Sequence, residues 1–118
     1  SNEVFQVEKL DNFKSENNLA KISYLKIDIV GHEEAALRGA KEILISDSPV
    51  VSLEMEMTRN LENCLSSIQI LQDCGYSKAY ILGNSFSGGK NSNFKETSIA
   101  EFKNRRPKRH KMVMFLKN

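Results

Sequence analysis

The chain has 118 residues, of which 40% are hydrophobic and 27% are charged, and its formal net charge is +2. These values are typical of one soluble globular domain, here 1–118, that is long enough to bury a modest core. No apolar run approaches the roughly 18 to 20 residues of a membrane-spanning helix, and no signal peptide opens the sequence, so we expect a cytoplasmic protein.

The first third of the chain predicts a short strand, a helical turn, a longer strand and a helix. Residues 4–10 have the pattern of an edge strand, and residues 11–18 that of a helical turn. Residues 22–29 alternate between apolar and polar side chains, which is typical of a strand. From Glu33 apolar residues recur at helical spacing through about Ser46, and two glutamates in the first turn favour the positive end of the helix dipole.

The remainder predicts another strand and helix, followed by two strands. Residues 50–57 alternate again, and Asn60 suits the N-cap of a helix that Gly75 ends. Residues 78–82 and 112–116 predict two further strands, separated by a long polar loop.

This order of elements favours the α/β class. Strand–helix–strand–helix–strand in about 60 residues argues for a parallel sheet built by right-handed crossovers. The last two strands are better suited to an antiparallel hairpin at the edge of the sheet. We therefore expect a mixed sheet with helices packed on it.

The only cysteines are Cys64 and Cys74. If both lie on the predicted helix, they are roughly 15 Å apart along its axis, whereas a disulfide needs Cα atoms within about 7 Å. They therefore do not pair, and we expect packing residues in a reducing compartment rather than metal ligands or nucleophiles. No metal site is predicted.

Four segments carry a resemblance to a known family. They are LDNF at 10–13, YLKIDIVGHE at 24–33, ALRGA at 36–40 and PVVSLE at 49–54. In this order and spacing they resemble the FkbM-type methyltransferase family, whose pattern runs LDD, then LKIDVEGxE, then LxGA, then a Pro followed by a Glu. The resemblance covers roughly residues 7–82.

The resemblance implies the C-terminal half of a Rossmann-like class I methyltransferase fold, with a three-layer-like mixed sheet. The front half of such enzymes holds the cofactor S-adenosylmethionine through a glycine-rich turn, and that turn is not present in this sequence. The complete family enzyme is expected to transfer a methyl group to a hydroxyl of a small hydroxylated or sugar-like acceptor. This chain, which begins with Ser rather than Met, is expected to be a fragment or degenerate form that binds the cofactor weakly or not at all and is inactive alone.

The resemblance also implies the site. Asp28 ends the first main strand, Glu33 matches the acid of the family's Gly-x-Glu, and His32 lies between them, which makes these three the candidate catalytic residues. Glu54, which matches the acid after the proline, is the candidate substrate-binding residue. Methyl transfer needs an acceptor held in line with the methyl donor and a group that takes its proton. Val30 stands where the family has Glu, and valine can accept neither a hydrogen bond nor a proton.

Each of these residues also has a structural interpretation. Asp28 and Glu33 can simply stabilise the start of the helix, which is worth about 0.3 to 1 kcal/mol each. His32 can be a solvated loop histidine.

Two other segments invite a different function. Six basic side chains between Lys103 and Lys111 leave 11 basic against 15 acidic residues elsewhere. This basic strip suggests an anion- or nucleic-acid-binding module, but it has no aromatic residue to stack bases, and a solvated hairpin loop is the preferred interpretation. The loop at 83–91 fails the spacing of a phosphate-binding loop. A non-catalytic interaction domain is the third alternative.

The expected partner is a small-molecule acceptor, with no membrane involved and nucleic acid disfavoured. Without a front half, the strand at 22–29 has an unpaired edge that can recruit another strand. A homodimer through this exposed sheet edge, or through an uncovered sheet face, is therefore expected unless residues 4–10 fold back over the edge.

Overall fold

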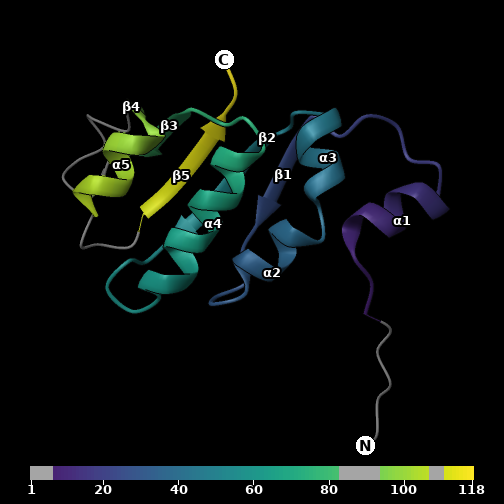
Figure 1. Ribbon diagram of the computed structural model, residues 1–118, viewed down its shortest axis with the longest axis horizontal. Coiled ribbons are helices and arrows are strands. Elements are labelled where there is room, and N and C mark those ends of the chain that lie inside the picture. The colour runs from purple at the N-terminus through teal and green to yellow at the C-terminus, as the bar shows by residue number, and fades with distance from the viewer. Residues whose placement is uncertain (1–6, 83–93, 107–110) are drawn as a thin grey trace, which may run out of the picture.

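The computed structural model describes residues 7–82, 94–106 and 111–118 (Figure 1). Its helices are α1 (Leu10–Glu16), α2 (Glu33–Arg38), α3 (Lys41–Ser46), α4 (Leu61–Asp73) and α5 (Ile99–Arg105). Its strands are β1 (Tyr24–Ile27), β2 (Val50–Met55), β3 (Lys78–Leu82), β4 (Phe94–Ser98) and β5 (Lys111–Leu116).

The strands form one mixed sheet in the order β1-β2-β5-β3-β4. β1 runs parallel to β2, whereas β5 lies antiparallel between β2 and β3, and β4 pairs antiparallel with β3. The predicted α/β class and mixed sheet are confirmed, and an open five-stranded sheet of this kind is compatible with an α/β methyltransferase fold. The predicted edge hairpin is wrong in one respect, because β5 is an interior strand and β4 occupies the edge.

The last third of the chain contains two elements that the periodicity did not predict, β4 and α5. β4 is short and polar, and α5 offers only two buried apolar residues, Ile99 and Phe102, so neither produces a strong repeat. A local signal is nevertheless present. Ser98 Oγ accepts a hydrogen bond from the Glu101 amide at 3.1 Å, and Ser-x-x-Glu is a pattern that marks helix starts.

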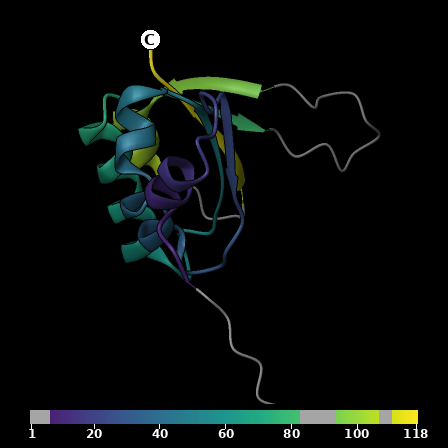
Figure 2. The ribbon, with the colours of Figure 1, turned by 90° about the vertical axis from the view of Figure 1, so that its right-hand side faces the viewer.

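All helices of the described part lie on one side of the sheet (Figure 2). The described residues therefore form two layers, and the expectation of a three-layer-like arrangement is not met by them. The core lies between the layers around Val51, Leu53, Val113 and Phe115, which are fully buried. The Phe115 ring of β5 packs edge to face against the Phe102 ring of α5, with 6.1 Å between the ring centroids. This contact holds α5 against the middle of the sheet.

The helix predicted from Glu33 to Ser46 is two helices. The carbonyl of Gly39 accepts a hydrogen bond from the Asp11 amide at 2.8 Å. Both carboxylate oxygens of Asp11 then accept bonds from the amides of Glu42 and Ile43, each at 3.0 Å. A side chain from α1 thus supplies the cap that starts α3, and local periodicity cannot connect residues that are 31 and 32 positions apart in the sequence.

Other predicted boundaries need smaller corrections. β1 ends at Ile27, so Asp28 follows the strand rather than closing it. Of the edge strand predicted at 4–10, residues 7–9 are irregular, Leu10 opens α1, and residues 1–6 lie outside the described part. Asn60 does precede α4, although its side chain makes no capping hydrogen bond, and Gly75 follows the helix with φ +99°.

The two cysteines are buried and free, as predicted. Within the ranges that the structure describes, no helix combines the length and apolar character needed to cross a membrane.

Candidate functional site

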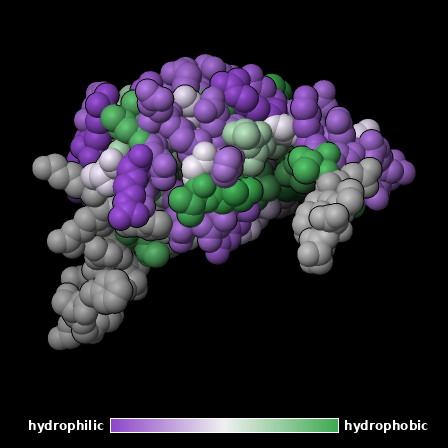
Figure 3. Space-filling view, turned by 90° about the horizontal axis from the view of Figure 1, so that it is seen from below, coloured by the Kyte–Doolittle hydropathy of each residue, from purple (hydrophilic) through white to green (hydrophobic). Residues whose placement is uncertain are grey.

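The carboxyl ends of β1 and β2 lie side by side, because the two strands are parallel neighbours. Beyond β1 the chain turns sharply into α2. Gly31 has φ +80°, a conformation that residues with a side chain rarely adopt. The His32 amide donates a hydrogen bond of 2.9 Å to the Ile29 carbonyl, which closes the turn. Seen from this end of β1, the surface mixes apolar and hydrophilic side chains (Figure 3). Ile29 and Val30 are 50% and 70% exposed.

Glu33 is the most unusual side chain of this turn, because it is only 6% exposed. Carboxylates are rarely this buried unless they are paired. Its Oε2 accepts a hydrogen bond of 2.6 Å from Asn63 Nδ2, and Asn63 Oδ1 in turn accepts the Glu34 amide at 3.1 Å. Asn63, from α4, therefore holds both the Glu33 carboxylate and the first turn of α2. Glu33 is thus fixed in place before any ligand arrives.

A small pocket opens at this point, and we call its lining the strand-end corner. Its residues are Val30, Glu33, Glu54, Glu56, Asn60, Asn63 and Cys64. The structure brings Glu33 and Glu54, two of the predicted site residues, to one pocket. Five of these seven residues carry side-chain oxygens, which can accept hydrogen bonds from a ligand. Three of the five are carboxylates, of which Glu56 pairs with Arg59 at 3.5 Å, so the corner disfavours anions.

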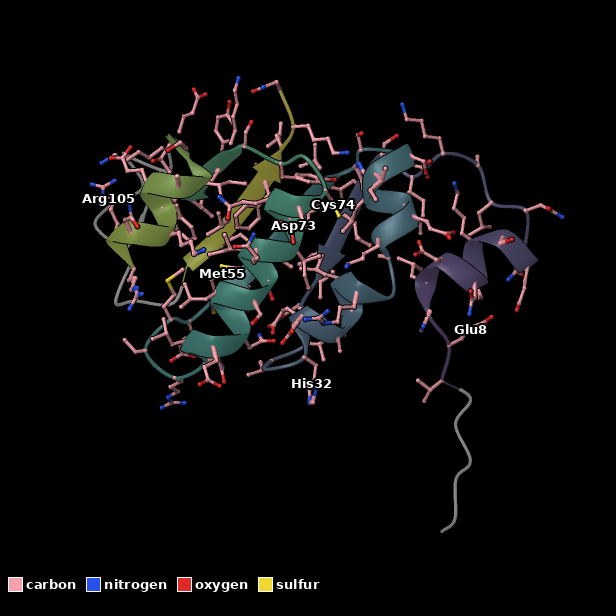
Figure 4. The ribbon with its side chains drawn as sticks, in the orientation of Figure 1. Glu8, His32, Met55, Asp73, Cys74 and Arg105 are labelled. Atoms are coloured by element: carbon pink, nitrogen blue, oxygen red, sulfur yellow. The ribbon has the colours of Figure 1, made fainter. Side chains whose placement is uncertain are left out.

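The other two predicted site residues do not line this pocket. Asp28 is exposed after the end of β1, and His32 is exposed before α2. His32 points away from the body of the molecule (Figure 4). A ligand would have to extend out of the pocket and over the turn to reach either of them.

Sequence reasoning missed Asn60, Asn63 and Glu56. Asn63 lies on the side of α4 that contacts α2, one turn before the buried Ser67, and a single polar residue at such a position gives no signal of a site in the sequence. Glu56 continues the alternation of Glu54, and this two-residue spacing could have pointed to it.

Cys64 lines the pocket as a buried, free thiol. Burial raises the pKa of this thiol and the Glu33 and Glu56 carboxylates add to the rise, although a hydrogen bond with the Glu56 backbone partly opposes it. The thiol stays protonated at neutral pH, which agrees with the packing role predicted for it.

A second depression, of about 320 Å³, lies between α1 and α3. Two carboxylates here have structural partners: Asp11, which lines the depression, and Asp47, which follows the lining residue Ser46. Asp11 caps α3, as described above. Asp47, at the end of α3, forms an ion pair of 2.8 Å with Lys14 and accepts the Ile22 amide at 3.0 Å. These two contacts, the Ile22 hydrogen bond first, hold the pKa of Asp47 below its ordinary value of 3.8. We call Asp11, Lys14 and Asp47 the α1–α3 corner.

The basic strip is only partly a loop. Lys103 and Arg105 belong to α5, and Lys103 Nζ donates to Gln69 Oε1 of α4 at 3.3 Å. Residues 107–110 of the strip, and the loop at 83–91, lie outside the described residues. Among the described residues no group of three or more potential ligands is placed to hold a metal ion.

The strand-end corner does not have room for S-adenosylmethionine. Its volume is about 20 Å³, whereas sites for ligands of drug size measure roughly 300 to 1,000 Å³. The larger depression between α1 and α3 is lined by those two helices and not by the ends of β1 and β2. Neither of these two depressions therefore combines enough room for the cofactor with a position at the ends of β1 and β2.

Comparison with known proteins identifies the family. The model of the methyltransferase FkbM domain matches residues 2–78, which is more than half of the chain. A search of curated proteins finds no match. The matched segment contains β1, the turn after it, β2 and the whole of α4. It confirms the resemblance stated from the sequence. The chain belongs to the FkbM methyltransferase family.

Proposed function

We propose that this chain serves S-adenosylmethionine-dependent O-methyl transfer and contributes the acceptor side of the site. The acceptor is a small, neutral, hydroxylated molecule such as a sugar. The observation that carries the proposal is the meeting of Glu33 and Glu54 in one pocket at the ends of two parallel strands, within the segment that the family model matches. In open α/β sheets, ligands bind outside this edge.

The roles follow from what each side chain can do. Glu33 and Glu54 accept hydrogen bonds from acceptor hydroxyls, and Asn63 keeps the Glu33 carboxylate oriented. Asp28 and His32, at the exposed rim, are the candidates for taking the proton of the reacting hydroxyl. Because the pocket carries three carboxylates, a phosphorylated acceptor is disfavoured.

We propose that this chain is not sufficient for methyl transfer by itself. The described corner is too small for the cofactor, so the chain alone binds it weakly or not at all and does not turn over. We infer that cofactor binding depends on structure additional to the described residues.

Acceptor binding can be tested without the cofactor. A ¹⁵N-labelled chain is titrated with methyl α-glucoside, and with glucose 6-phosphate as the anionic comparison. We expect the neutral probe to shift the amide signals of residues 30–34, Asn60 and Asn63, and the phosphate to shift them at least about 5-fold less at equal concentration. Glu33→Gln should abolish the shifts. Its control, Glu34→Gln, should keep them, because Glu34 pairs with Arg38 outside the pocket.

Shifts that are larger with the phosphate, or that cluster away from the strand-end corner, would contradict the acceptor assignment. Anion or nucleic-acid binding by the basic strip stays a prediction. The contacts of the described residues give it no support. The non-catalytic interaction domain also stays a prediction, and turnover by an assembly that contains this chain would exclude it.

A further inference from the structure

The face of the sheet opposite the helices has no cover among the described residues (Figure 2). Directly paired residues of neighbouring strands point to the same face. The register therefore places one row of side chains across this open face, in the order Lys26, Ser52, Met114, Tyr80 and Glu96. Leu53 and Val113, which follow Ser52 and precede Met114 in their strands, are buried on the helix side, and Ser52 itself is 2% exposed between its neighbours.

The row has a centre and two unlike ends. Met114 lies on β5, the middle strand of the five, and is partly buried among its neighbours. Lys26 is exposed at the β1 end, and the Glu96 side chain is 56% exposed at the β4 end. Leu116, two residues along β5, continues the apolar centre on the same face. A cation and a carboxylate therefore lie at equal strand distances from an apolar midpoint.

We propose that the open face binds a second copy of this chain. The two-fold axis runs parallel to β5, midway between two stacked sheets. This operation places β1 over β4 of the second copy, β2 over its β3, and β5 over its β5. Each Lys26 then faces Glu96 of the other copy, twice in the dimer, and Met114 packs on Met114. Stacked sheets lie about 10 Å apart with strand directions within about 30°, a separation that side chains of this length fill.

The charges also explain why the second copy stacks rather than pairing edge to edge. Edge pairing of β1 with itself uses four residues and brings both Lys26 side chains to the same short ribbon. Glu96 has no role in that arrangement, because it lies at the far edge of the sheet. Among the described residues, Glu96 pairs with Lys78 at a long distance of 3.9 Å, and exposed pairs of this kind contribute about 0 to 1 kcal/mol. Its carboxylate can therefore accept a second cation.

The small size of the face favours a weak contact. Five strands at about 4.8 Å spacing and about five residues of length give a patch of roughly 24 by 17 Å. This projected area is about half of the roughly 800 Å² per partner found in stable complexes. We therefore expect a weak dimer, with a dissociation constant of about 100 µM.

Sedimentation of the chain between 5 and about 500 µM measures this equilibrium. Met114→Glu brings two carboxylates together at the axis and should raise the dissociation constant at least about 10-fold. The control is Ile45→Glu, which adds the same charge at a 61% exposed position on α3 and should change nothing. Circular dichroism of each variant establishes that the fold is kept.

Charge reversal identifies the arrangement. Lys26→Glu and Glu96→Lys should each weaken the dimer by about 5-fold, and the double variant should recover the parent affinity within about 2-fold. Recovery requires that the two residues face each other. A chain that is monomeric up to 500 µM would overturn the proposal. So would a dimer that survives Met114→Glu and protects the β1 amides from hydrogen exchange, because that result would assign the contact to the sheet edge.

Discussion

The α1–α3 corner and the strand-end corner both contain carboxylates at the ends of short helices, but they differ in what those carboxylates bind. Asp11 and Asp47 accept hydrogen bonds from backbone amides or pair with Lys14, so the contacts given for them join elements of the fold. At the strand-end corner, Glu33 is oriented by the side chain of Asn63 and lines a pocket with Glu54. Under the proposed function, Asp11 and Asp47 stabilise the fold alone, whereas Glu33 and Glu54 also line a pocket for a ligand.

The largest effect on stability should come from Asp11→Ala. The substitution leaves two amides at the start of α3 without their side-chain partner, and loss of such a cap costs about 1 to 2 kcal/mol. Urea unfolding followed by circular dichroism measures it. The exposed neighbour Asn12→Ala is the control and should stay within about 0.5 kcal/mol of the parent. Equal losses in both variants would mean that α3 does not depend on the cap.

Glu33→Ala should lower the free energy of unfolding by somewhat less, about 1 kcal/mol, because the Asn63 amide loses its hydrogen-bond partner in a part-buried position. Glu33→Gln should recover most of that loss while still removing the charge that faces the pocket. The two variants thus separate the structural and the ligand-binding contributions of one side chain. If Glu33→Gln were as unstable as Glu33→Ala, Glu33 would belong with the acids that hold the fold.

The Asp47 contacts predict a dependence on pH. Because its pKa is lower in the folded chain than the ordinary value of 3.8, the unfolded chain binds the proton first as the pH falls. The stabilisation by Asp47 is complete above about pH 3.8, and it is lost as the pH falls through the lower pKa that Asp47 has in the folded chain. Asp47→Asn should flatten this part of the curve of unfolding free energy against pH. An unchanged slope in the variant would assign the acid sensitivity to other groups.

The smallest effect on stability should come from Val30→Glu, which restores the acid that the family resemblance places here. Val30 is 70% exposed, so the change should stay within about 0.5 kcal/mol. It should not create binding of S-adenosylmethionine, because the volume of the corner, and not one missing carboxylate, is limiting. Calorimetric titration of this variant tests the point, and a gain of micromolar affinity would show that Val30 is the cause.

The local parts of both corners were predictable, and the contacts between elements were not. Alternation around Leu25 and Ile27, the glycine at 31 and the following glutamates predicted β1, the turn and α2. The pairing of Glu33 with Asn63 depends on how α2 packs against α4, and the capping of α3 by Asp11 depends on where α1 lies. Periodicity reports on one element at a time, so it could not supply either contact.

The same limit explains the errors in the sheet. The strand positions at 50–57, 78–82 and 112–116 were close, but the insertion of β5 between β2 and β3 is decided by pairing over long distances in sequence. Which face of the sheet the helices cover is likewise a property of the assembled layers. The open face, and with it the row from Lys26 to Glu96, could be identified only once the register was known.

The most direct test of the account is calorimetric titration of the parent chain with S-adenosylmethionine. The strand-end corner is proposed to bind the acceptor and is too small for the cofactor, so we expect no saturable heat up to about 1 mM. A dissociation constant of 1 mM corresponds to a binding free energy of only about −4 kcal/mol. A dissociation constant in the micromolar range for these 118 residues would contradict the account, because the chain would then hold a complete cofactor site.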